Sequence, residues 1–203
     1  MPKRAKRKQG LLVVVSGPSG VGKSTVVKKL LKLDKKIVVS TSATTRPPRP
    51  GESNGVHYYF ITQEDFDRQV KKGGFLEWAR VHNYYYGTPK ESIEEELSRG
   101  KTVVCEVDVQ GADSIKEVVE KRKLNASVVF IFLIPPSVDI LAFRLKKRKT
   151  EDEEVMNYRL RAAIAELQVM EKYDYIVVND KVETAAEKIK AVINVEKERT
   201  LLN

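Results

Sequence analysis

The chain has 203 residues, of which 41% are hydrophobic and 32% are charged. This length supports one substantial core with small inserted lobes, and no stretch approaches the roughly 18 unbroken apolar residues of a membrane-spanning helix. One cysteine (Cys105) and two histidines (His57 and His82) exclude an intramolecular disulfide and a cysteine-cluster metal site, and they argue against a histidine-based site. We therefore expect a soluble protein of a reducing, cytoplasmic compartment, without a membrane partner.

Positive charge is concentrated at the start of the chain. The formal net charge is +9, and five of these charges lie in the first ten positions, which leaves +4 for the remainder. Such basic tails bind nucleic acid or an anionic surface in some proteins and are solvated and disordered in others. We expect a disordered tail over residues 1–10 and no stable nucleic-acid partner. The modest charge of the remainder suits polyanionic substrates, and no pattern predicts an oligomeric state.

Short apolar runs, rich in Val and Ile, predict strands over residues 11–16, 37–40, 102–107, 127–134 and 175–178. They alternate little between apolar and polar residues, as is typical of strands covered on both faces of a parallel sheet. Helical stripes lie between and after them, carried by Val26, Val27, Leu30 and Leu31, by Ile115, Val118 and Val119, by Val138, Leu141 and Leu145, and by Val155, Ile164 and Leu167. The alternation predicts an α/β protein, with three layers (α/β/α) around a mostly parallel five-stranded core sheet.

Two regions interrupt the alternation. Residues 41–99 are rich in Tyr, Gly, Pro and polar side chains, which indicates an inserted substrate lobe, and residues 146–156 form a charged segment between two helices, which is typical of a mobile lid. The predicted organisation places the core over residues 11–40, 100–143 and 160–203, the lobe over 41–99 and the lid over 144–159.

A glycine-rich turn joins the first predicted strand to the first predicted helix. Its sequence, Gly17-Pro18-Ser19-Gly20-Val21-Gly22-Lys23-Ser24 followed by Thr25, matches the phosphate-loop (P-loop) pattern in its required strand–loop–helix context. In such a loop, backbone N–H groups and the helix N-terminus surround phosphates, the lysine reaches the β- and γ-phosphates, and the Ser24 hydroxyl is a Mg²⁺ ligand. We predict a nucleoside triphosphate site here, although the loop does not identify the acceptor.

Two arginines in the predicted lobe are held by a proline-rich backbone. Arg46 and Arg49 lie among Pro47, Pro48 and Pro50, which restrict the chain and fix the direction of two guanidinium groups. Such groups suit a phosphate monoester, and the hydroxyls of Tyr58 and Tyr86 are able to complete its shell. Alone, this pair would fit a solvated loop; beside a phosphate loop it indicates a second phosphate.

The sequence resembles the guanylate kinases. The resemblance is carried by the phosphate loop, by Arg159-Leu160 and Asn179-Asp180, and by residues 40–52, 54–60, 75–79, 85–88 and 106–111, so that the matching motifs extend from about residue 11 to 180. It implies a P-loop kinase fold with an inserted GMP-binding lobe and a helical lid. It also implies ATP and GMP as substrates and Mg²⁺ as the metal that accompanies ATP.

The resemblance also implies roles for the residues of the lobe. Guanine presents two adjacent donors, N1–H and the N2 amine, which one carboxylate is able to accept, and adenine lacks this pair. By resemblance Glu77 binds N1 and N2, and the other acceptor residues are Ser42, Arg46, Arg49, Tyr58, Tyr86, Gly87, Thr88 and Asp108. Glu106 is implied near Mg²⁺, through water. Many members of the family have Asp in its place, which leaves open whether Glu106 or Asp108 serves the metal.

Arginines of the predicted lid are expected at the transferring phosphoryl group, because phosphoryl transfer depends on positioning and charge neutralisation. By resemblance Arg148 and Arg159 contact the triphosphate and the transition state. Arg144 lies toward the adenine side, with Asn179 and Asp180. Lys23, Arg46, Arg49, Arg148 and Arg159 are therefore the predicted catalytic residues.

Three functions compete. The first is an enzyme that transfers a phosphoryl group from ATP to GMP. The second is a non-catalytic guanylate-kinase-like module that binds phosphopeptides; its phosphate loop is usually degraded, whereas the loop of this chain is intact. The third is a P-loop kinase of another small acceptor, against which Glu77 and the Arg46–Arg49 pair argue. The sequence therefore favours the first.

Overall fold

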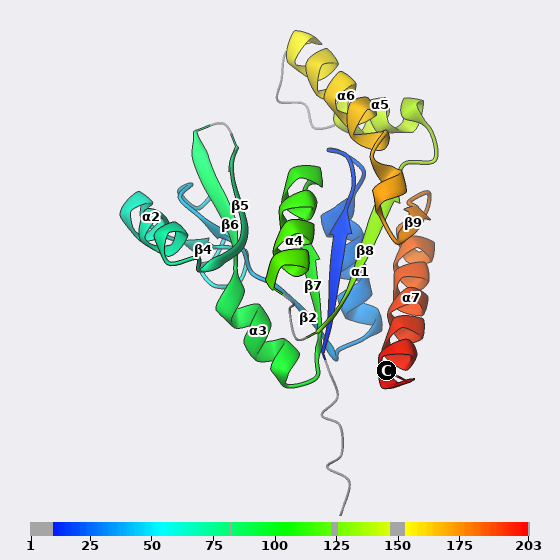
Figure 1. Cartoon of the computed structure of the whole chain (residues 1–203). Helices are drawn as coiled ribbons and strands as arrows, with labels where there is room; N and C mark the ends of the chain where they lie inside the picture. Colours follow the sequence, from blue (N-terminus) through cyan, green and yellow to red (C-terminus); the bar gives the residue numbers. More distant parts are fainter. Residues whose placement is uncertain (1–9, 82, 123–125, 147–152, 203) are drawn as a thin grey trace, which may run out of the picture.

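A computed structural model describes residues 10–81, 83–122, 126–146 and 153–202 of the chain. Its centre is a five-stranded parallel sheet in the order β2-β7-β1-β8-β9 (Figure 1). The strands are β1 (Leu11–Ser16), β2 (Ile37–Val39), β7 (Thr102–Glu106), β8 (Ser127–Ile134) and β9 (Tyr175–Val178). The predicted class, α/β with a parallel five-stranded sheet, is confirmed.

Helices cover both faces of this sheet because its strands are apolar on both sides. Leu11, Val13 and Val15 of β1 face one cluster, whereas Leu12 and Val14 face the other. The first cluster is completed by α1 (Lys23–Leu33) and α7 (Val182–Leu202), and the second by α3 (Lys90–Ser98), α4 (Val109–Arg122) and the residues around the short 3-10 helix η1 (Met170–Lys172).

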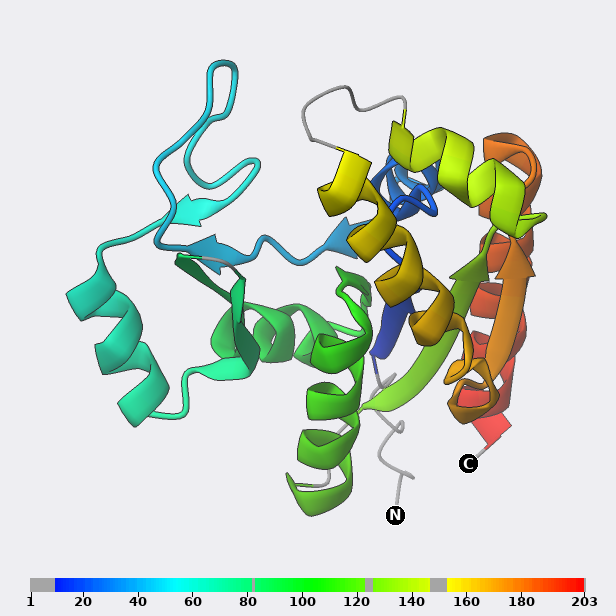
Figure 2. The same ribbon diagram turned by 90° about the horizontal axis from the view of Figure 1, so that it is seen from above.

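A separate four-stranded sheet, in the order β4-β3-β6-β5, forms a lobe beside the core (Figure 2). It consists of β3 (Ala43–Thr44), β4 (Tyr59–Phe60), β5 (Phe75–Val81) and β6 (Tyr84–Pro89), with helix α2 (Gln63–Lys71). Its small core contains Ala43, Phe66 and Phe75, and the rings of Phe66 and Phe75 are stacked with centroids 4.5 Å apart. The lobe therefore has a hydrophobic core of its own.

Two helices, α5 (Val138–Lys146) and α6 (Glu153–Leu167), pack on each other above the phosphate loop (Figure 1). Leu141, Leu145 and Ala163 form their buried contact, with Leu160 beside them. Val138 and Ile164 lie on α5 and α6, as the apolar pattern predicted, but they are 43% and 36% exposed. The pair packs through Leu141 and Leu145 on α5 and the small Ala163 on α6.

The parallel register brings the functional segments to one edge of the sheet. Val15 of β1 pairs with Glu106, the last residue of β7, so the phosphate loop that follows β1 begins beside the acidic end of β7. Ligands of open α/β sheets bind beyond the carboxyl ends of the strands. Among the described residues, none of the helices is both long and apolar enough to cross a membrane.

Phe66→Ala should destabilise the lobe by about 3–5 kcal/mol, since it removes a fully buried ring and leaves a cavity. The sole tryptophan, Trp78, lies with its ring centroid 6.3 Å from that of Phe66, so its fluorescence during urea unfolding measures the change directly. Phe143→Ala, at a side chain 64% exposed, is the control and should cost less than about 0.5 kcal/mol. Equal costs would contradict the separate lobe core.

Candidate active site

The phosphate loop turns through left-handed glycines into the start of α1. Gly22 has φ +97° and precedes the first helical residue, Lys23. Gly20 has φ +83°, and a Cβ there would lie 2.7 Å from Cδ2 of Leu145 on α5. The helix N-terminus carries N–H groups without intrahelical partners, which makes the loop an anion-binding site.

Lys23 folds back over the phosphate loop. Its Nζ donates to the carbonyl oxygens of Gly17 at 2.6 Å and Pro18 at 3.3 Å. The ammonium group therefore lies over the same turn that presents the backbone N–H groups. This places a fixed positive charge and a set of backbone donors together, which suits the phosphates of a nucleotide.

The Ser24 hydroxyl faces an acid from the neighbouring strand. Its Oγ donates to Oε1 of Glu106 at 2.5 Å, which joins α1 to the end of β7. The next acid, Asp108, uses Oδ1 to accept the N–H of Gly111 at 2.7 Å near the start of α4. Glu106 thus bonds directly to the last residue of the phosphate-loop motif, whereas the hydrogen bond of Asp108 is made to the start of α4.

Arg46 is buried in the lobe, and an acid holds it. Its Nη2 donates to both carboxylate oxygens of Glu52 at 2.9 Å, and its Nη1 donates to the Pro47 carbonyl. Glu52 also accepts the N–H of Arg49 at 2.7 Å. This N–H, and then the Arg46 guanidinium, hold the pKa of Glu52 below its ordinary value.

Aromatic rings complete the surroundings of Arg46. Its guanidinium carbon lies 5.5 Å from the ring centroid of Tyr58 and 5.7 Å from that of Phe60. Tyr86 packs edge-on against Tyr58, with centroids 6.0 Å apart. The structure therefore brings three of the predicted phosphate-binding side chains together, Arg46, Tyr58 and Tyr86, while the Arg49 side chain is exposed nearby in the chain.

Glu77 on β5 lies where the lobe meets the core. The Thr88 hydroxyl donates to its Oε1 at 2.5 Å, and a Cβ added to Gly111 of α4 would lie 3.2 Å from its Oε2. Burial, with a smaller contribution from the charge of Asp108, raises the pKa of Glu77 to about 7 against the opposing effect of the hydrogen bonds from Thr88. A carboxyl group whose pKa is near neutral pH is easily ionised when a ligand offers it hydrogen-bond donors.

Two other predicted acceptor residues frame this position. Gly87 on β6 pairs with Ala43 on β3 and is fully enclosed, because a Cβ there would lie 2.9 Å from the Phe75 ring. Ser42 directly precedes β3 and accepts the N–H of Tyr59 through its carbonyl. Gly87 thus belongs to the sheet that carries Glu77 and Thr88, and Ser42 is joined to that sheet by its bond to Tyr59.

The predicted donor-side residues beyond the loop contact its backbone. Arg144 on α5 donates to the carbonyls of Val21 at 3.3 Å and Asn179 at 3.0 Å, with Asp180 beside it. The buried Asn179 side chain donates to Val21 at 2.7 Å. Arg159 on α6 donates to the Ser19 hydroxyl at 3.2 Å. Arg148 lies outside the described residues.

Two acids at this site were not predicted from the sequence, Glu52 and Glu166. Glu52 lies six positions after Arg46, and an acid inside a basic, proline-rich loop was the signal for it. Glu166 on α6 accepts the N–H of Ser19 at 3.1 Å, across 147 positions of sequence, and only the folded chain reveals that contact.

The fold and these two anion sites define a phosphotransferase of the P-loop class: a triphosphate loop at the carboxyl edge of a parallel sheet, and an arginine clamp on a separate lobe. The guanylate kinase family model matches residues 9–196 of the chain. The guanylate kinase of Caldanaerobacter subterraneus subsp. tengcongensis is 48% identical over 94% of this chain and 90% of that protein, and that of Clostridium perfringens (strain SM101 / Type A) is 46% identical over 97% and 88%. The chain belongs to the guanylate kinase family.

Solved structures agree. The guanylate kinase of Anaplasma phagocytophilum has a TM-score of 0.73 at 34% identity, covering 94% of this chain and 87% of that one. The tunicamycin resistance protein of Deinococcus radiodurans, at 16% identity and a TM-score of 0.51 over 91% of this chain and 96% of that one, shares the fold alone. The predicted family and fold class are both confirmed.

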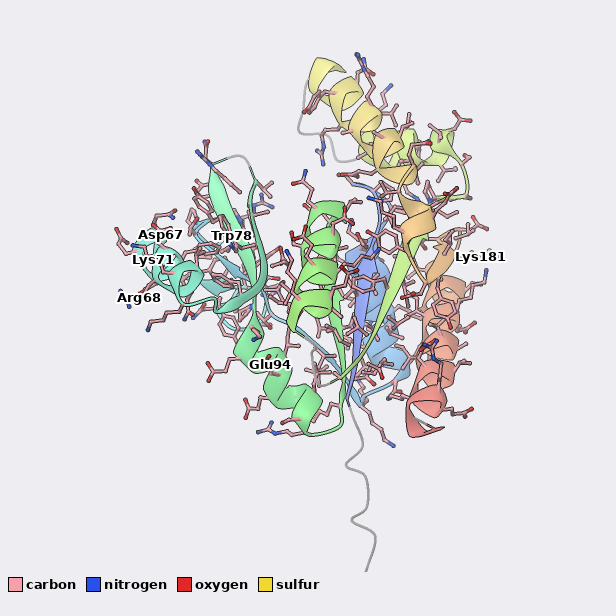
Figure 3. All side chains as sticks on the ribbon, viewed as in Figure 1. Asp67, Arg68, Lys71, Trp78, Glu94 and Lys181 are labelled. Carbon is pink, nitrogen blue, oxygen red and sulfur yellow. The ribbon has the colours of Figure 1, made fainter. Side chains whose placement is uncertain are left out.

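Glu77→Gln should stabilise the substrate-free protein at pH 8. The folded-state pKa of about 7 lies above the ordinary 4.5, so ionised Glu77 destabilises the fold. The penalty is absent below pH 4.5, grows between pH 4.5 and 7, and reaches on the order of 3 kcal/mol above that range. Urea unfolding of both proteins from pH 5 to 8 measures it. Asp67→Asn, on the outward side of α2 (Figure 3), is the control, and an equal gain there would refute the assignment.

Proposed function

We propose that the chain transfers the γ-phosphoryl group of ATP to GMP, giving ADP and GDP, with ATP on the phosphate loop and GMP on the lobe. Membership of the guanylate kinase family establishes the activity as that of an ATP:GMP phosphotransferase. The assignment of ATP to the loop and GMP to the lobe rests on the presence of two separate anion sites. One lies around Lys23 and Ser24, and the other lies around Arg46.

On the donor side, the loop residues 17–25 bind the triphosphate through backbone N–H groups, and Lys23 neutralises its β- and γ-phosphates. Arg144 and Asn179 act together with Asp180 at the adenine end. The side chains of Arg144 and Asn179 both donate to the Val21 carbonyl of the loop, and Arg144 also donates to the Asn179 carbonyl. These bonds support the proposal, because they join the two residues to the phosphate loop.

On the acceptor side, Arg46 and Arg49, with Tyr58 and Tyr86, bind the phosphate of GMP. The phosphate of GMP has to compete with Glu52 for these donors, and the greater negative charge of the phosphate favours its binding. The base is bound by Glu77, whose carboxylate accepts N1–H and the N2 amine, with the polar groups of Ser42, Thr88 and Asp108 and the close approach at Gly87 around it. Since guanine offers donors, GMP binding should lower the pKa of Glu77 and release a proton near neutral pH.

The oxygen pair of Ser24 and Glu106 fits Mg²⁺. Mg²⁺ prefers hard oxygen ligands, keeps several waters and binds through few side chains together with substrate phosphates. Within the described ranges, no cluster of three or more His, Cys, Asp or Glu side chains could hold a metal by itself, which agrees with that mode. Ser24 would hold the ion directly and Glu106 through water, and the ion would neutralise charge on the phosphates of ATP.

Transfer proceeds when an oxygen of the GMP phosphate attacks the γ-phosphorus and the bond to the bridging oxygen of ADP breaks. No general base is required, because the attacking phosphate is already anionic. Lys23, Arg46, Arg49, Arg148 and Arg159 neutralise the charge that the two substrates bring together. The contact of Arg159 with Ser19 supports its role, because it places a guanidinium at the loop.

We propose the same division of the chain that the sequence predicted. The core comprises residues 11–40, 100–143 and 160–203, the GMP lobe residues 41–99 and the lid residues 144–159. Closure of the lobe and the lid would exclude water from the reacting phosphates. We also propose a cytoplasmic location, since a buried single Cys105 and nucleotide substrates suit that compartment.

A coupled assay with ATP and GMP, dGMP, AMP, CMP or UMP in turn tests the acceptor. GMP should be preferred over AMP by at least about a hundredfold in kcat/KM, since AMP would leave Glu77 unpaired. Glu77→Ala should reduce this ratio mainly by raising KM for GMP. AMP used as well as GMP by the wild-type protein would refute the role of Glu77, and Asp67→Asn, which changes an exposed acid of the lobe, should leave the ratio unaltered.

Lys23→Ala tests the donor side. Turnover should fall by at least about a thousandfold, because the lysine neutralises charge that develops in transfer. The thermal unfolding temperature should stay near that of the wild type, since Lys23 is half-buried in the loop, outside the hydrophobic core, and donates to the loop carbonyls of Gly17 and Pro18. Lys181→Ala, at an exposed lysine before α7 (Figure 3), is the control. Unchanged turnover in Lys23→Ala would contradict the donor assignment.

A further inference from the structure

Helix α6 contacts the phosphate loop at one residue through two side chains. The backbone N–H of Ser19 donates to Oε2 of Glu166 at 3.1 Å, and Nη2 of Arg159 donates to the Ser19 Oγ at 3.2 Å. Arg159 and Glu166 are seven positions apart, about two helical turns, so they lie on the same face of α6. A base and an acid of one helix thus hold opposite ends of one loop residue.

Apolar contacts on the same face set the height of α6 above the loop. Leu160 and Ala163 lie between Arg159 and Glu166 and pack on Leu141 and Leu145 of α5. Leu145 in turn lies against Gly20, where a Cβ would be only 2.7 Å away. The apolar contacts fix how far α6 lies from α5, and the two polar contacts at Ser19 add directional bonds to the loop, one of them made by Arg159 itself.

The position of Glu166 is unfavourable for the helix itself. It lies in the last turn of α6, which contains no basic residue, and a carboxylate there opposes the negative end of the helix dipole. Its partner is a backbone N–H in the loop that precedes the positive end of α1. A residue that breaks a local rule and is compensated only by a distant functional loop is a candidate for a functional role.

We propose that Glu166 is a positioning residue for the transfer reaction: it anchors the end of α6 to the phosphate loop and thereby holds Arg159 at the phosphates. The proposal rests on the proposed role of Arg159. Glu166 touches neither substrate, and its effect on the reaction passes through the helix.

In a different interpretation, the Glu166 carboxylate occupies the position of a phosphate in the substrate-free protein, and ATP has to displace it. The two interpretations differ in the effect of the charge. A displaced carboxylate would weaken ATP binding, so its neutralisation would strengthen binding. An anchor needs only an acceptor oxygen, so Glu166→Gln, which keeps that oxygen and removes the charge, should behave almost as the wild type.

The test compares Glu166→Ala, Glu166→Gln, Arg159→Ala, the double variant Arg159→Ala/Glu166→Ala and the control Glu187→Ala, at an exposed acid of α7. Glu166→Ala should lower kcat by about 10- to 100-fold with KM for GMP within about twofold, since misplacement of a charged group by about 1 Å costs rate rather than acceptor binding. Glu166→Gln should stay within about threefold of the wild type. In the Arg159→Ala background, Glu166→Ala should have less than about a twofold further effect, because it acts through Arg159.

Amide hydrogen exchange gives a measurement independent of activity. The Ser19 amide of the substrate-free protein should exchange slowly in the wild type and in Glu166→Gln, and fast in Glu166→Ala. Glu166→Asp, whose carboxylate is one methylene shorter, should behave as Glu166→Ala does. It takes the place of Glu166→Ala in the test if that variant does not fold. A wild-type protein inactive on GMP would refute the proposed function and leave this amide measurement valid.

Four outcomes would overturn the anchor. They are an unchanged kcat in Glu166→Ala, multiplicative effects in the double variant, a loss in Glu166→Gln as large as in Glu166→Ala, and ATP binding more than about tenfold tighter in Glu166→Gln. The last would identify Glu166 as a stand-in for phosphate. Thermal unfolding of each variant separates a loss of stability from a loss of positioning.

Discussion

A site built to bind polyanions concentrates hydrogen-bond donors, and donors that are partly buried need acceptors. In this protein carboxylates meet that need at three points: Glu106 accepts from the Ser24 hydroxyl, Glu52 from the Arg46 guanidinium, and Glu166 from the Ser19 amide. Glu106 and Glu166 come from elements other than those that carry their donors, whereas Glu52 lies six positions after Arg46 in the same loop. The three contacts therefore answer one electrostatic constraint, which is that polar groups proposed to bind the phosphates or Mg²⁺ need acceptors in the substrate-free protein.

Glu77 is in the opposite situation, because it is a buried acceptor whose hydrogen bonds from Thr88 do not offset the cost of burial. Burial makes ionisation costly and raises its pKa to about 7, and Thr88 compensates only in part. A guanine edge supplies the two donors that the ionised form lacks. In the proposed function, selectivity would come from the energy that destabilises the substrate-free site, since a base without this donor pair would leave the carboxylate buried and unpaired.

The parts of the site that depend on consecutive residues were predictable. Residues 17–25 form a local turn whose glycines and lysine carry the pattern, and the five apolar runs correspond to the five strands of the parallel sheet. The contact between Ser19 and Glu166 spans 147 positions and depends on how α6 lies on α5, which no local pattern encodes. Val138 and Ile164 show the same limit, because a helical stripe is wide and the partner helix selects which residues of it are buried.

The two substrate sites differ in how they are joined to the sheet. The donor loop is held directly by the core, through Arg144, Asn179 and α6, so its shape depends on packing already formed before ATP binds. The guanine site that we propose lies where β5 of the lobe meets α4 of the core, and a Cβ at Gly111 would be 3.2 Å from Oε2 of Glu77 there. Because Glu77 belongs to the lobe and Asp108 to the core, a bound base would contact both bodies at once. We infer that recognition of the base and the approach of the lobe to the core are one event, so that the same carboxylate that selects guanine also helps to bring the acceptor phosphate toward ATP.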